Sequence, residues 1–215
     1  MMQLTVSGLI PLPLKDKIER LGSDFWNKNL KFEQGERIFV LAPSGTGKTT
    51  LIHTLYNLRQ DHLGSVSWDK HQLNATDRED FAQRRTKDIS VIFQDLRLFP
   101  ELSAWENLEV KRRLTHTVTE KQVADWMERL GISDKKNAIA RTLSYGEQQR
   151  VAIIRALLQP FKWLLMDEPF SHLDHKNKEK AAALVQEVID KHQAGFLLAD
   201  LDENTYFNYT QTIRL

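Results

Sequence analysis

Residues 42–50 could form a loop that holds phosphate groups. They read Ala-Pro-Ser-Gly-Thr-Gly-Lys-Thr-Thr and stand between an apolar run and an expected helix. Glycines let backbone N–H groups approach phosphate oxygens, and the N-terminus of the helix adds a positive partial charge. Lys48 could reach the β- and γ-phosphates, and the Thr49 hydroxyl could bind Mg²⁺. ATP is therefore expected to contact eight residues, which are Pro43, Ser44, Gly45, Thr46, Gly47, Lys48, Thr49 and Thr50.

The first position of this loop departs from the usual pattern. Phosphate loops of the form G-x-x-x-x-G-K-[ST] begin with glycine, whereas this chain has Ala42. Because alanine disfavours a positive φ, some strain is expected there.

Two carboxylates follow another apolar run. Asp167 and Glu168 come directly after residues 162–166. Ligands of open α/β sheets bind beyond the carboxyl ends of the strands, so Asp167 is expected to join Thr49 around Mg²⁺. Glu168 would then orient or deprotonate the attacking water. An acidic turn without function is the alternative, and the phosphate loop makes it much less favoured.

The elements that would position these residues alternate between strands and helices. Four short apolar runs are typical of buried parallel strands, at 37–42, 89–93, 162–166 and 196–199. Helical spacing predicts helices at 49–58, 104–113, 120–130, 146–158 and 176–192. An edge strand is expected at 2–10, interrupted by Pro11 and Pro13, with a further strand at 30–34. This order predicts an α/β fold with a mainly parallel sheet, a small antiparallel β edge and a helical lobe.

Composition narrows the classes of function. The 215 residues are 41% hydrophobic, which favours one globular domain. Thirty basic and 29 acidic residues give a net charge of +1, so no nucleic-acid partner is expected. The absence of cysteine excludes disulfides and thiolate metal sites. We find no signal peptide and no apolar stretch of about 18 residues, so work at a membrane would require a docking partner.

Residues 143–150, Leu-Ser-Tyr-Gly-Glu-Gln-Gln-Arg, are followed by Val-Ala-Ile-Ile-Arg-Ala-Leu. This segment resembles the signature motif of ABC (ATP-binding cassette) ATPases, L-S-G-G-Q with a Q-R-V-A-x-A-R-A-L continuation. The resemblance implies that the motif contacts the γ-phosphate held by the opposite subunit of a dimer. The residues of this chain that match the motif and would make this contact are Ser144, Tyr145, Gly146 and Glu147. Tyr145 and Glu147 depart from the consensus.

Two further motifs stand in the same order along the chain as in ABC ATPases. Gln94 resembles the Q-loop glutamine, which implies a catalytic role and a place in the Mg²⁺ environment beside Thr49 and Asp167. Residues 171–174 resemble the D-loop that ends in Asp174. The resemblance covers about 29–210 and implies a P-loop NTPase fold over a single domain, 1–215. Its nucleotide-binding core would be 1–94 and 159–215, and its helical signature lobe 95–158.

Two departures from the family affect the expected chemistry. The position of the usual switch histidine holds Ala199, so slow hydrolysis is expected unless another group, such as His172, substitutes. The aromatic ring that stacks on adenine is missing from residues 3–23. Phe25 and Trp26 are the nearby candidates, although core packing is the favoured role for both.

The segment after Gln94 resembles the groove that receives a membrane partner in transporters. Five apolar residues could form this socket or instead the core of the helical lobe, namely Leu96, Leu98, Phe99, Leu102 and Trp105. The segment looks most like the lipoprotein-release, macrolide-efflux and cell-division branch.

These features together predict an ATP-binding and ATP-hydrolysing subunit. It would form a homodimer around ATP and drive an integral membrane permease, from the cytoplasmic face of the inner or plasma membrane. The alternatives are a hydrolysis-impaired regulatory cassette and a soluble ABC ATPase without a transport role.

Overall fold

Two β-sheets organise the chain in the computed structural model, which describes residues 1–73 and 78–215. The larger sheet is parallel, and its strands in spatial order are β6 (Ile89–Ile92), β7 (Trp163–Asp167), β8 (Gly195–Asp200), β3 (Arg37–Leu41) and β9 (Gln211–Arg214). The smaller sheet is antiparallel, in the order β2 (Asn29–Glu33), β1 (Gln3–Pro11), β4 (His62–Trp68) and β5 (His71–Gln72).

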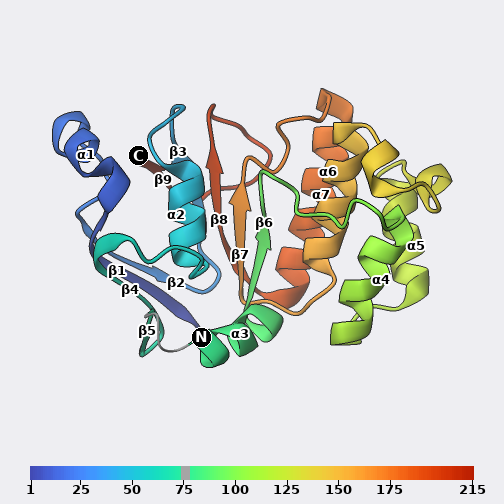
Figure 1. The fold of residues 1–215 in the computed structure, drawn as a ribbon, viewed down its shortest axis with the longest axis horizontal. Helices are drawn as coiled ribbons and strands as arrows, with labels where there is room; N and C mark the ends of the chain where they lie inside the picture. Colours follow the sequence, from blue (N-terminus) through green and yellow to red (C-terminus); the bar gives the residue numbers. More distant parts are fainter. Residues whose placement is uncertain (74–77) are drawn as a thin grey trace.

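Helices flank the parallel sheet and extend to one side of it (Figure 1). The α-helices are α1 (Lys15–Leu21), α2 (Lys48–Leu55), α3 (Arg78–Lys87), α4 (Ala104–Thr115), α5 (Glu120–Arg129), α6 (Tyr145–Leu157) and α7 (His175–His192). Short 3₁₀ turns occur at η1 (Leu12–Leu14), η2 (Ser133–Lys135) and η3 (Ala140–Thr142). No helix within the described ranges is long and apolar enough to cross a membrane.

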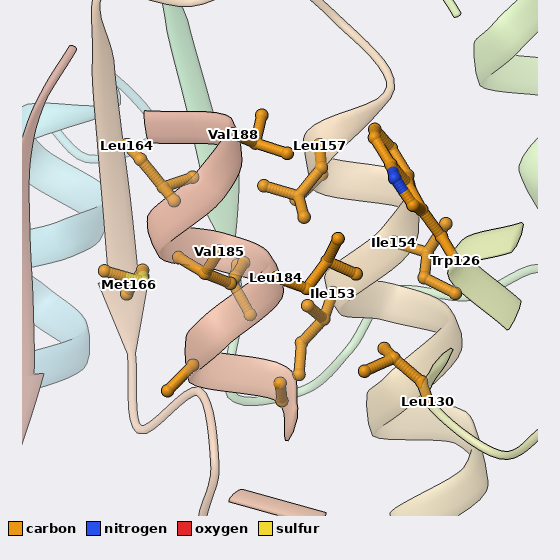
Figure 2. Packing of buried hydrophobic residues seen from close by; sticks show 14 of the residues in the cluster. Trp126, Leu130, Ile153, Ile154, Leu157, Leu164, Met166, Leu184, Val185 and Val188 are labelled. Carbon is orange, nitrogen blue, oxygen red and sulfur yellow. The ribbon is translucent and has the colours of Figure 1, made fainter. Parts of the chain in front are cut away.

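The parallel sheet separates two hydrophobic clusters because alternate side chains of a strand point to opposite faces. On β7, Leu164 and Met166 join one cluster, whereas Trp163 and Leu165 join the other. Figure 2 shows the first cluster: α7 lies between β7 and α6, and α5 packs beyond α6. The second cluster contains α2 and side chains of the antiparallel sheet. The parallel strands and α2 are thereby packed on both faces of the sheet, next to the loops that follow the strands.

The α/β fold with a parallel sheet is confirmed, and each predicted element lies within three residues of its observed bounds. The helical segments of 95–158 are α4, α5 and α6, and the division into a core and a signature lobe stays a prediction.

The strand predicted at 2–10 is present as β1, but its predicted place at the edge of a sheet is wrong. β1 pairs with β2 on one side and with β4 on the other, so it lies inside its sheet. Pro11 still pairs in register with His62, after an irregularity between Ser7 and Ile10. The error arose because β4 was not predicted.

Candidate functional site

The loop 42–50 joins the end of β3 to the start of α2, as expected for a phosphate loop. Gly45 and Gly47 have φ of 76° and 108°, a region that favours glycine. A Cβ at Gly47 would lie 2.5 Å from Cδ1 of Leu14 and 3.2 Å from Cζ2 of Trp26, so a side chain there would require Leu14 to move. The φ of Ala42 is not positive, so the backbone strain that the sequence led us to expect at this position does not arise.

The outer side of this loop is braced by the segment that precedes β2. The Trp26 Nε1–H donates to the Thr46 carbonyl at 3.2 Å, and the Lys17 ammonium donates to the Gly45 carbonyl at 2.6 Å. Phe25 is 0% exposed and Trp26 is 3% exposed, so both rings are core residues. Neither ring is free to stack on a base, in agreement with the core-packing alternative.

Lys48 is the first residue of α2 and is 6% exposed. Its ammonium donates to the Ala42 carbonyl at 2.9 Å and lies 3.3 Å from Oε1 of Glu168. Glu168 is itself buried, has a φ of 45°, and donates its backbone N–H to the Ala199 carbonyl. The structure thus brings together the predicted phosphate-binding cation and the predicted general base.

Asp167 is fully buried, and neither of its carboxylate oxygens has a hydrogen-bond partner within residues 1–73 and 78–215. Burial raises the pKa of Asp167 to about 6, against the opposing effect of the neighbouring Thr49 hydroxyl. The Thr49 hydroxyl donates to Oε1 of Gln94 at 3.2 Å. Oxygen donors of these types are what Mg²⁺ prefers, so the Asp167 carboxylate, the neighbouring Thr49 hydroxyl and the Gln94 amide bonded to Thr49 fit this ion.

The structure places Ala199 inside the second hydrophobic cluster, where it offers no polar side chain. The next residue, Asp200, was missed by the sequence analysis, although a polar residue that ends an apolar run is a usable signal. Burial raises the pKa of the Asp200 carboxyl, and the charge of Glu168 raises it further. A second acidic group therefore lies within the electrostatic reach of Glu168.

The signature segment begins α6. Ser144 is the N-cap and forms a capping box with Glu147, whose carboxylate accepts from the Ser144 hydroxyl at 2.8 Å. A Cβ at Gly146 would lie 2.9 Å from the carbonyl of His172, so this turn packs against residues 171–174. Asp174 caps α7 by accepting from the Asn177 N–H at 2.8 Å.

The predicted apolar socket is only partly correct. Leu96 is buried, while Leu98 and Trp105 pack against the first hydrophobic cluster, as the alternative of a lobe core predicts. Leu102 does not line the observed groove, but Phe99 does. This groove has a volume of about 270 Å³ and lies between the parallel sheet and α4. Its principal lining residues are Tyr56, Phe93, Phe99, Val110, Lys111, Leu114 and Arg155.

Comparisons with known proteins agree with the geometry. The family model described as ABC transporter matches residues 25–171. The glucose import ATP-binding protein GlcV of Saccharolobus solfataricus is 34% identical over 191 residues, 87% of this chain and 53% of GlcV. The lipoprotein-releasing system ATP-binding protein LolD of Shewanella denitrificans is 32% identical over 181 residues, 82% of this chain and 77% of LolD.

The chain also resembles solved structures. A dimer of the ATP-binding cassette MJ0796, in a post-hydrolysis state bound to ADP and Pi, has a TM-score of 0.75 and 25% sequence identity. The match covers 93% of this chain and 88% of that one. The similarity therefore extends over nearly the whole chain.

Proposed function

The chain belongs to the ABC transporter family, and on that premise we propose that it binds ATP with Mg²⁺, dimerises around the nucleotide and drives an integral membrane permease by hydrolysis. One observation carries the proposal: Lys48, Glu168 and the unpartnered Asp167 meet at the phosphate loop. Calorimetry tests it directly, because folded protein that takes up no ATP in the presence of magnesium would overturn it.

Each group has a role that follows from its position. Residues 43–50 would bind the phosphates through backbone N–H groups, and Lys48 would contact the β- and γ-phosphates. Thr49, Gln94 and Asp167 would hold Mg²⁺, which neutralises charge on the phosphate oxygens. Glu168 would accept a proton from the attacking water. Its ion pair with Lys48 keeps the carboxylate directed towards the loop.

The pKa of Asp167 predicts how nucleotide binding depends on pH. Metal binding requires the ionised carboxylate, and with a pKa of about 6 its ionised fraction falls about tenfold between pH 7 and pH 5. We expect the Mg²⁺-dependent part of the ATP affinity, measured by calorimetry, to fall by about the same factor. Asp167→Asn is the control for protonation of ATP itself, and an equal fall in this variant would contradict the assignment.

The nucleotide-free protein should show the opposite dependence of stability on pH. The folded pKa of Asp167 lies above the ordinary 3.8, so between these values the folded state binds more protons than the unfolded state. This carboxyl therefore favours folding at low pH, and its contribution decreases as the pH rises towards 6.

A second copy of this chain is the proposed partner in the dimer. Ser144 and Gly146 lie at the start of α6, where backbone N–H groups and the helix dipole favour an anion. We propose that they contact the γ-phosphate bound by the other subunit, with Tyr145 and Glu147 beside them. The dimeric cassette similar to this chain supports this arrangement.

The groove beside α4 is the proposed docking site for the permease. Phe99 and Leu114 are 50% and 76% exposed at its rim. Burial lowers the pKa of Arg155 to about 10 and also lowers that of Lys111. The Arg155 guanidinium already donates to the backbone carbonyls of Leu96 and Arg97, each at 2.7 Å. Lys111 lies among the apolar lining residues of the groove, so a helix with apolar side chains and one carboxylate directed at Lys111 would complement it. The chain would then lie on the cytoplasmic face of the membrane. Its near-neutral charge favours no nucleic-acid partner.

Replacing Leu114 with serine should weaken this docking. The side chain is exposed, so the variant should fold, while the loss of an apolar contact at the interface is expected to reduce recovery of the permease about tenfold. The measurement is affinity capture from detergent-solubilised native membranes with quantitative mass spectrometry. Leu63→Ser on β4 is the matched control, because Leu63 is 46% exposed outside the groove. Equal recovery with both variants would contradict the docking site.

A further inference from the structure

One face of α6 contacts both loops that approach the proposed nucleotide. Tyr145 and Gln149 are four residues apart and therefore lie on the same side of this helix. The Tyr145 hydroxyl donates to the backbone carbonyl of Gln94 at 3.2 Å. The Gln149 side-chain amide donates to the backbone carbonyl of Glu168 at 3.3 Å. A single helix thus holds the segment that carries the proposed metal-binding amide and the segment that carries the proposed base.

The contact between α6 and residues 168–174 is tight. The Tyr145 ring packs edge-on against the His172 ring, with centroids 4.1 Å apart. The His172 backbone N–H donates to Oε1 of Gln149 at 3.0 Å. Because the Tyr145 ring is held in this way, its hydroxyl has a defined direction towards Gln94.

Gln94 is held at two points from different parts of the molecule. Its backbone carbonyl accepts from Tyr145 on α6, whereas its side-chain Oε1 accepts from the Thr49 hydroxyl at the phosphate loop. The position of the Gln94 amide beside Thr49 therefore depends on where the first turn of α6 lies. Glycine, which the family consensus has at position 145, has no side chain with which to make either contact.

We propose that Tyr145 is a positioning residue for the ATP-bound metal site. Its hydroxyl fixes the Gln94 backbone, and the Gln94 amide is thereby held where it can join Thr49 and Asp167. This role rests on the proposed function. It adds a contact within one subunit between the signature segment and the proposed metal site. The start of α6, which would contact the partner's nucleotide, also sets the metal environment of the subunit's own nucleotide.

The test is the effect of Mg²⁺ on binding of a non-hydrolysable ATP analogue, measured by calorimetry with and without the metal. Tyr145→Phe removes the hydroxyl and keeps the ring that packs on His172. One hydrogen bond contributes a net effect of about 0.5–1.5 kcal/mol. The enhancement of analogue affinity by Mg²⁺ is therefore expected to fall by about twofold to thirteenfold. Affinity without metal is the baseline for each variant, so the ratio of the two affinities removes any effect of Tyr145 on the nucleotide held by the partner subunit.

Tyr206→Phe is the matched control, since Tyr206 packs on Phe170 away from Gln94. Unchanged enhancement by Mg²⁺ in Tyr145→Phe would overturn the inference, whatever the affinity in the absence of metal. A wild-type protein that binds no analogue would instead refute the proposed function. Thermal unfolding of each variant confirms that only folded proteins are compared.

Discussion

Replacing Lys48 with methionine is expected to lower the affinity for ATP by about a hundredfold or more. Lys48 is 6% exposed and follows two glycines with positive φ, Gly45 and Gly47. A charge-assisted hydrogen bond to phosphate in this partly desolvated place is much stronger than one at the surface. Methionine keeps most of the length and apolar contacts of the stem, so the loss should report the charge. Calorimetry with Mg²⁺ and ATP measures it.

The same substitution also leaves a buried carboxylate without its partner. Glu168 lies 3.3 Å from the ammonium, and an uncompensated buried charge destabilises a protein. The double variant Lys48→Met, Glu168→Gln removes this penalty and should show the same loss of affinity in a more stable fold. Lys31→Met is the surface control, since Lys31 is 62% exposed on β2. Wild-type affinity in the folded single variant would show that the loop does not bind phosphate through Lys48.

The parts of the fold that could be predicted are those with strong local patterns. Buried parallel strands are continuous apolar runs, and 162–166 and 196–199 were found for this reason. β4 is different: its sequence, His-Leu-Gly-Ser-Val-Ser-Trp, has no such run, and only Val66 and Trp68 are buried. Its pairing with β1 is a long-range contact, which one sequence does not reveal.

The same distinction applies to the site. The phosphate loop and the acidic strand end are contiguous in sequence, and the structure brings Lys48 to Glu168 as their motifs suggested. The contact of Tyr145 with Gln94 joins positions 51 residues apart and depends on how α6 packs. The groove was only partly predicted, because exposure of Leu114 and burial of Leu96 are decided by the packing of α4 and not by hydrophobicity.

Glu168→Gln should lower the rate of ATP hydrolysis by about a hundredfold to a thousandfold, because the amide cannot accept the proton of the attacking water. The substitution keeps size and shape, and its oxygen can still accept from Lys48 at the position of Oε1. ATP should therefore remain bound, and the dimer it holds should accumulate. Gel filtration with ATP and Mg²⁺ is expected to show a species of twice the 25.0 kDa chain, and a steady-state phosphate-release assay measures the rate.

Glu187→Gln on α7 is the matched control, because Glu187 is exposed and pairs with Arg129 far along the chain from the loop. Wild-type hydrolysis in Glu168→Gln would assign the base to another group. Asp200 is then the candidate, since its carboxyl is sensitive to the charge of Glu168. Asp200→Asn would decide between the two.

If folded Glu168→Gln stayed monomeric with ATP and Mg²⁺, the signature residues would have no partner nucleotide to contact. A binding-only cassette, by contrast, would dimerise in both forms and hydrolyse ATP in neither, even when assembled with its permease.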